Sequence, residues 1–184
     1  MPYLITYLVV VFVAWALVVT SRPRRTWTEV FRSFFDPTLH LLAWTSFAAL
    51  GAPAAEYILF RWPLPWYLHA VGAAAILGSG VLSLIANKTL GQAFTPYVDA
   101  DATRKEIVRK GVYKYIRHPL YTAGFLLTAG APLALACRFS WFFTALCWAA
   151  ILVRTAREER LLKKNMAGYQ DYVRQTKRFV PWVI

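Results

Sequence analysis

The segment Arg117-His118-Pro119-Leu120-Tyr121 combines two side chains that bind anions with a proline that favours the start of a helix. Pro119 suits the first helical turn because its missing N–H would have no partner there. Arg117 and His118 then lie at the N-terminus of that helix, where unpaired amides and the helix dipole already favour negative charge. The pattern predicts a place for the carboxylate of an amino-acid-like cofactor.

A second charged group lies further along the chain and comprises Arg154, Arg157, Glu158 and Glu159. Arg154 and Glu158 are four residues apart and therefore share one face of a helix. Spacing alone favours ordinary ion pairs at a membrane boundary. However, the apolar stretches between residues 120 and 153 predict a tight helical hairpin, which would bring both charged groups to the same face of the membrane.

The elements that position these groups are predicted to be membrane helices. Hydrophobic residues make up 58% of the 184-residue chain and charged residues 16%, whereas soluble domains usually carry about a quarter charged residues. Mean hydropathy is +0.42. Five apolar stretches are long enough to cross a bilayer, the last two at the lower limit. They cover residues 3–20, 39–60, 63–86, 120–136 and 139–153.

The fold is therefore predicted to be all-α, a polytopic integral membrane protein with about five transmembrane helices. We expect one membrane domain over residues 1–184. Residues 1–86 would form three N-terminal helices, and residues 87–184 would form the catalytic half. That half would include the last hairpin and a polar tail that is helical through Met166.

The basic residues predict the orientation of these helices. The net charge is +12, and all 21 Lys and Arg residues except Arg61 and Arg138 lie in residues 21–38, 87–119 and 154–184. Under the positive-inside rule these three segments are cytoplasmic and the N-terminus lies outside. The charge then favours an anionic membrane leaflet as its partner, and we expect no nucleic acid.

Two features of the predicted helices suggest structural roles. Small residues, among them Gly72, Ser79 and Ser83, recur along residues 63–86 and permit close helix packing, either within the chain or at a dimer seam. The oligomeric state stays open. Glu56 lies inside an apolar stretch, where an acid is costly, and we expect it to pair with Arg61 or His69. The three histidines form no metal-ligand cluster, so no metal is expected.

The order of motifs along residues 85–184 resembles the isoprenylcysteine carboxyl methyltransferase family. The related phospholipid N-methyltransferases share much of the pattern. Individually the motifs are short, but their order and spacing make the combination specific. They are Gly111-Val112-Tyr113, Arg117 to Tyr121, Gly124, an apolar hairpin, Glu158-Glu159, and a tail with Tyr169, Tyr172, Thr176, Arg178 and Pro181.

The resemblance implies a membrane methyltransferase that uses S-adenosylmethionine without a Rossmann domain. Its cofactor pocket would be formed by the long loop, the last hairpin and the tail. The resemblance and the predicted helix N-terminus at residues 117–119 together give the predicted cofactor-binding residues. They are Val108, Tyr113, Arg117, His118, Pro119, Tyr121, Glu158 and Glu159. Which of the two adjacent glutamates meets the cofactor stays open. Arg154 and Glu158 are the predicted catalytic residues, with Arg154 facing the acceptor.

The acceptor is expected to be lipophilic: an isoprenylcysteine-like carboxylate, a phospholipid or another lipid. A carboxylate is already a nucleophile, so Arg154 need only orient it. An amine or hydroxyl needs a base, for which Glu158, Glu159 and His118 are candidates. An NADPH-dependent membrane reductase of the sterol-reductase type is the main alternative, because such enzymes have a similar Arg-His-Pro-x-Tyr segment. A non-enzymatic membrane protein of this fold is a third.

Overall fold

A computed structural model describes residues 1–21, 36–91 and 107–181. This part of the chain is helical, with one isolated parallel bridge between Ile116 and Lys177 and no longer strand. The all-α prediction is therefore confirmed for the described residues. The elements are α1 (Pro2–Ser21), α3 (Pro37–Phe60), α4 (Trp66–Leu90), the 3-10 helix η3 (Gly111–Lys114), α5 (Pro119–Ala134), α6 (Trp141–Asn165) and α7 (Tyr169–Gln175).

Each predicted apolar stretch coincides with one of the five long helices. Helix α4 begins at Trp66 and continues to Leu90, and α6 continues to Asn165, so the polar segment after Val153 is helical as predicted. Helices α1 and α4 are long and apolar enough to cross a membrane. The count of five transmembrane helices stays a prediction.

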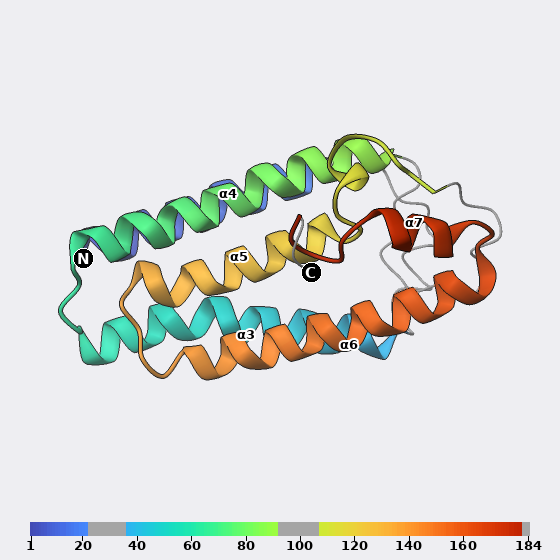
Figure 1. Cartoon of the computed structure of the whole chain (residues 1–184). Coiled ribbons are helices and arrows are strands. Elements are labelled where there is room, and N and C mark those ends of the chain that lie inside the picture. The colour runs from blue at the N-terminus through green and yellow to red at the C-terminus, as the bar shows by residue number, and fades with distance from the viewer. Residues whose placement is uncertain (22–35, 92–106, 182–184) are drawn as a thin grey trace.

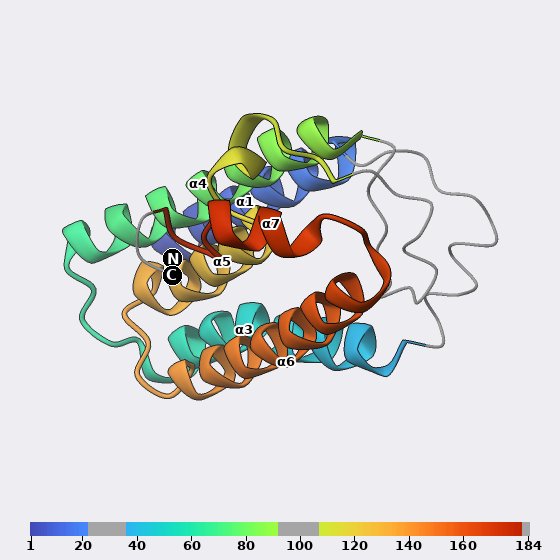
Figure 2. The same cartoon turned by 45° about the vertical axis from the view of Figure 1, so that its right-hand side comes forward.

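The long helices run side by side along one direction (Figure 1). Helix α1 packs against α4, α3 packs against α6, and α5 lies between these two pairs, as the turned view also shows (Figure 2). The short helix α7 and the 3-10 helix η3 lie at the same end of the bundle. The functional residues discussed below gather at that end.

Glycines permit the closest helix contacts. A Cβ atom on Gly72 of α4 would overlap the backbone nitrogen of Ala134 and lie 2.7 Å from the carbonyl oxygen of Gly130, both in α5. A Cβ atom on Gly80 would lie 3.0 Å from the Cα of Ala14 in α1. The small residues of α4 therefore pack within the chain, which is one of the two roles their spacing predicted.

Glu56 has a different partner from those predicted. Its carboxylate accepts hydrogen bonds of 2.6, 3.1 and 2.8 Å from the backbone N–H groups of residues 138–140 and one of 2.6 Å from the Ser140 hydroxyl. The pairing with Arg61 or His69 was wrong because the amides before α6 have no helical partner of their own and form a stronger site for a carboxylate. This contact ties α3 to the hairpin at the end opposite η3.

The packing of α4 on α5 makes a stability prediction with a matched control. Gly72→Ala forces the backbones of α4 and α5 apart and should destabilise the fold by about 1–3 kcal/mol. Gly78→Ala, on the same helix with no atom within 4 Å, should be neutral or stabilising by up to about 1 kcal/mol because alanine favours helix. Thermal unfolding of both variants in one detergent checks this. Equal melting temperatures would contradict the packing.

Candidate functional site

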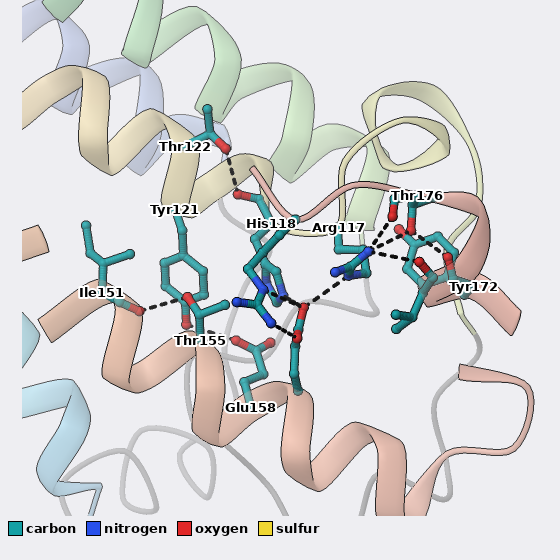
Figure 3. Close-up of polar contacts among 12 residues, drawn as sticks. Arg117, His118, Tyr121, Thr122, Ile151, Thr155, Glu158, Tyr172 and Thr176 are labelled. Carbon is teal, nitrogen blue, oxygen red and sulfur yellow. Dashed lines mark hydrogen bonds and ion pairs between the residues drawn. The ribbon is translucent and has the colours of Figure 1, made fainter. Parts of the chain in front are cut away.

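The site is built around the buried carboxylate of Glu159 on α6. It accepts hydrogen bonds from Arg117 Nε at 3.0 Å, His118 Nε2 at 3.2 Å and Arg178 Nη2 at 2.7 Å. Glu159 is only 3% exposed. Removing a carboxylate from water is costly unless charged donors surround it. Three donors from two distant segments meet that need, and Figure 3 shows two of them, Arg117 and His118, beside α6.

The C-terminal tail is fastened to the motif by its backbone as well. Hydrogen bonds of 2.8–3.1 Å join residues 115–118 to residues 177–178. The guanidinium of Arg117 also donates to the carbonyl oxygens of Val173 and Thr176. Figure 3 shows Arg117 pointing toward Thr176. Arg117 therefore joins α6 and the tail to the residues just before α5.

The start of α5 matches its prediction. Pro119 is buried in the first turn of α5, and His118 is the residue before it. The His118 side chain makes no capping bond to α5. It turns instead toward Glu159, so its ring is held beside the carboxylate rather than over the helix N-terminus.

The surroundings of Glu159 keep it ionised. Burial by itself would raise the pKa of this carboxyl, but the hydrogen bonds from His118, Arg178 and Arg117 outweigh it and hold the pKa well below the ordinary value of 4.5. The same contact raises the pKa of Arg178. Glu159 is thus a fixed negative charge and has no proton to exchange near neutral pH.

A second network centres on the hydroxyl of Tyr121 in α5. This hydroxyl donates to Glu158 Oε2 at 2.9 Å and accepts from Arg154 Nε at 3.0 Å. Arg154 and Glu158 therefore share a helix face, as their spacing predicted. Arg154 Nη1 donates further to Asp36 Oδ2 at 3.0 Å and to Thr38 Oγ1 at 2.7 Å. The network thus reaches from α5 and α6 to the start of α3.

Sequence reasoning missed Asp36. It is the N-cap of α3, where its Oδ1 accepts from the amides of Thr38 at 3.0 Å and Leu39 at 3.3 Å. The signal for that role is present, because aspartate before proline is typical of a helix start. Its contact with Arg154, 118 residues later, leaves no trace in local spacing.

Aromatic side chains surround the first network. Tyr113 in η3 is buried, and its carbonyl oxygen accepts a 2.7 Å bond from the Tyr172 hydroxyl. Burial raises the pKa of Tyr113 and Tyr169 well above 10 and that of Tyr172 to about 12. The Phe179 ring lies 6.1 Å from the His118 ring. These tyrosines stay neutral and offer apolar faces and hydroxyl donors.

Six of the nine predicted site residues thus fall into two adjoining networks. Arg117, His118 and Glu159 contact one another, and Tyr121, Arg154 and Glu158 do the same. Val108 is half-buried on the segment leading into η3 and is not part of either network. The rest of the long loop before residue 107 lies outside the described residues, as do the arginines of residues 22–32.

The matches to known proteins include the segments that form these networks. Residues 67–167, more than half of the chain, match the phospholipid methyltransferase family. The chain belongs to this family. The matched region contains η3, the hairpin and both glutamates, although it ends before Tyr169 and the tail.

Individual relatives of this phospholipid methyltransferase family member share a quarter to a third of their residues with it over the aligned region. The probable protein-S-isoprenylcysteine O-methyltransferase of Oryza sativa subsp. indica is 25% identical over 122 residues, which are 64% of this chain and 63% of that protein. Protein-S-isoprenylcysteine O-methyltransferase B of Arabidopsis thaliana is 26% identical over 121 residues, 64% of this chain and 61% of that protein. The chain therefore spans less than two thirds of these relatives.

A bacterial relative has a different name. The nickel-cobalt-cadmium resistance protein NccN of Alcaligenes xylosoxydans xylosoxydans is 30% identical over 120 residues, 59% of this chain and 51% of that protein. Among the described residues of this chain, no group of three His, Cys, Asp or Glu side chains could hold a metal ion. The metals mentioned in its name concern that relative alone.

The Glu159 network makes a second stability prediction. Glu159→Gln leaves buried cations without a charged partner and should destabilise the protein by about 3 kcal/mol. Glu158→Gln is the matched control, because Glu158 is half-buried and a glutamine oxygen can still accept from Tyr121. Melting temperatures in detergent test this. A larger loss for Glu158→Gln would contradict the assignment of Glu159 as the central carboxylate.

The lowered pKa of Glu159 also predicts a pH dependence. A carboxyl whose folded pKa lies below its unfolded value stabilises the fold fully above the unfolded value, about 4.5, and loses that effect as pH falls toward the folded value. The difference in melting temperature between wild type and Glu159→Gln should therefore be largest above pH 4.5 and shrink below it. A difference that grows on acidification would contradict an ionised Glu159.

Proposed function

We propose that this chain is a membrane methyltransferase that transfers a methyl group from S-adenosylmethionine to a lipophilic acceptor. The observation that carries the proposal is the pair of adjoining networks at one end of the bundle, within a chain of the phospholipid methyltransferase family. Cationic, carboxylate and aromatic side chains lie together there. Those are the groups that an amino acid joined to a sulfonium and an adenine requires.

The donor set fits the amino-acid part of the cofactor. Glu158 Oε1 accepts no hydrogen bond from the described residues, so it is available to an ammonium group. Arg178 is 40% exposed beside Glu159 and is reachable by a carboxylate. His118 contacts the same Glu159 carboxylate, at 3.2 Å. We therefore assign Glu158, rather than Glu159, as the glutamate that meets the cofactor.

The aromatic residues fit the sulfonium and the adenine of the cofactor. Tyr113, Tyr169 and Phe179 are buried around the first network, and their ring faces favour a sulfonium or stack on adenine. When bound, S-adenosylmethionine supplies an electrophilic methyl group on a positively charged sulfur. The protein then has to align the acceptor with that group and exclude water rather than supply elaborate acid–base chemistry.

Two residues would act on the acceptor. Arg154 is linked to Glu158 by the Tyr121 hydroxyl and orients the acceptor. When the nucleophile of the acceptor carries a proton, Glu158 receives that proton. The hydroxyl of Tyr121 couples the two. Arg117 acts as a positioning residue, because its guanidinium is engaged by Glu159 and by tail carbonyls.

We also propose the membrane arrangement in full. Five helices cross the bilayer, the N-terminus lies outside, and the end of the bundle with η3 and α7 faces the cytoplasm. The apolar lengths of α1 and α4 and the distribution of basic residues support this. An acceptor dissolved in the bilayer would then approach Arg154 from the lipid side.

The reductase alternative gains no support from the family match. The two hypotheses differ in cofactor, so a binding experiment separates them. S-adenosylhomocysteine should raise the melting temperature of the purified full-length chain in detergent, and NADPH should not. Stabilisation by NADPH alone would refute the methyltransferase proposal.

A variant tests the assigned glutamate. Glu158→Gln should weaken S-adenosylhomocysteine binding at least tenfold, about 1.4 kcal/mol, because it removes the charged partner of the ammonium. Its melting temperature without ligand should stay near that of wild type. Titration calorimetry on the two proteins provides the affinities. Unchanged affinity would show that Glu158 is not the ammonium partner.

A further inference from the structure

Arg154, the arginine assigned to the acceptor, already has an anionic partner. Its Nη1 lies 3.0 Å from Asp36 Oδ2, with Arg154 4% and Asp36 7% exposed. A guanidinium whose charge is already balanced by a buried carboxylate attracts a second carboxylate less strongly than an unpaired guanidinium would. This contact bears on which acceptors the site admits.

We propose that Asp36 is a specificity-determining residue. Its carboxylate occupies the anion-binding side of Arg154 and restricts the site to acceptors whose nucleophile is an amine or a hydroxyl. Acceptors with a free carboxylate are excluded. This inference rests on the proposed methyltransferase function and names the substrate class of that same site.

Asp36 is held too firmly to yield easily. Its Oδ1 accepts from the amides of Thr38 and Leu39 and from the Thr38 hydroxyl at 2.6 Å, while Oδ2 faces Arg154. Both oxygens are thus engaged at the N-terminus of α3, where the helix dipole adds to the attraction. Moving Asp36 aside would break the N-cap hydrogen bonds of α3 and the ion pair with Arg154.

The charges point the same way. Arg154 is flanked by two carboxylates, Asp36 at 3.0 Å and Glu158 across the Tyr121 hydroxyl. Arg157 lies 3.5 Å from Asp36 but is 44% exposed, so solvent screens it. A third carboxylate entering this buried cluster would meet two carboxylates that already balance the charge of Arg154, whereas a neutral nucleophile adds no charge.

A neutral nucleophile needs a proton acceptor, and the cluster contains one. The lone pair of the acceptor nitrogen or oxygen forms the new bond to the methyl carbon. The carbon–sulfur bond breaks, and its electron pair stays on sulfur. The proton of the nucleophile passes to the Glu158 carboxylate on the side of Oε2, because Oε1 is assigned to the ammonium group of the cofactor. An ionised carboxylate acceptor has no proton to release and would not need this base.

The test measures transfer of radiolabelled methyl groups by the purified full-length chain in detergent. The probes are N-acetyl-S-farnesylcysteine, dioleoylphosphatidylethanolamine and 4-dodecylphenol, which present a carboxylate, an amine and a hydroxyl. Alkali releases label from methyl esters but not from methylated nitrogen or phenol oxygen. Wild type should yield no alkali-labile label from the carboxylate probe. Abundant alkali-labile label would overturn the proposal.

Asp36→Asn is the decisive variant, because asparagine also caps helices but carries no charge. It should yield alkali-labile label from the carboxylate probe at least tenfold above the background level that wild type shows. Asp36→Ser, another good cap, provides a second variant should Asn fail to fold. Asp171→Asn, a matching change at a 65% exposed site on α7, should behave as wild type. No gain on the carboxylate probe in either folded Asp36 variant would refute the role of Asp36.

Failure of the underlying function has a different signature. If S-adenosylhomocysteine does not bind and neither wild type nor any variant labels any probe, the methyltransferase proposal itself fails. If S-adenosylhomocysteine binds and wild type esterifies the carboxylate probe, only the role of Asp36 fails. If S-adenosylhomocysteine binds and the carboxylate probe is methylated only when the Asp36 charge is removed, both the methyltransferase function and the role of Asp36 are supported.

Discussion

The buried charge of Glu159 is the constraint on which the rest of the site depends. A carboxylate that is 3% exposed has to be surrounded by charged donors, and no single helix supplies them. Arg117 and His118 come from the start of α5 and Arg178 from the tail, 42, 41 and 19 residues away. Meeting this need brings α5, α6 and the tail together at one end of the bundle.

This constraint separates the tasks of two adjacent residues. Glu159 is engaged by three cationic side chains, so it acts as a structural charge, whereas Glu158 contacts Tyr121 through Oε2 and its Oε1 accepts no hydrogen bond from the described residues. Tyr121 then extends the site to Arg154, and Arg154 extends it to Asp36 on α3. Asp36, which lies outside the region that matches the family, thus contributes directly to this network.

The sequence predicted much of this, and the reasons for success and failure are physical. Long apolar stretches, Pro119 at a helix start and the spacing of Arg154 and Glu158 are local signals, and each corresponds to an observed feature. Contacts between distant segments are not local. The pairing of Glu56 with the amides before α6 and that of Asp36 with Arg154 depend on how the helices pack, which periodicity does not encode.

The central claim is that S-adenosylmethionine binds between η3, the start of α5 and the two glutamates of α6. Ultraviolet cross-linking of radiolabelled S-adenosylmethionine to the purified chain, followed by identification of the labelled peptide, tests it most directly. We predict label on a peptide containing Tyr113, Tyr121 or Tyr169, prevented by excess S-adenosylhomocysteine. Label confined to peptides of α1 or α3, or label that S-adenosylhomocysteine does not reduce, would contradict the claim.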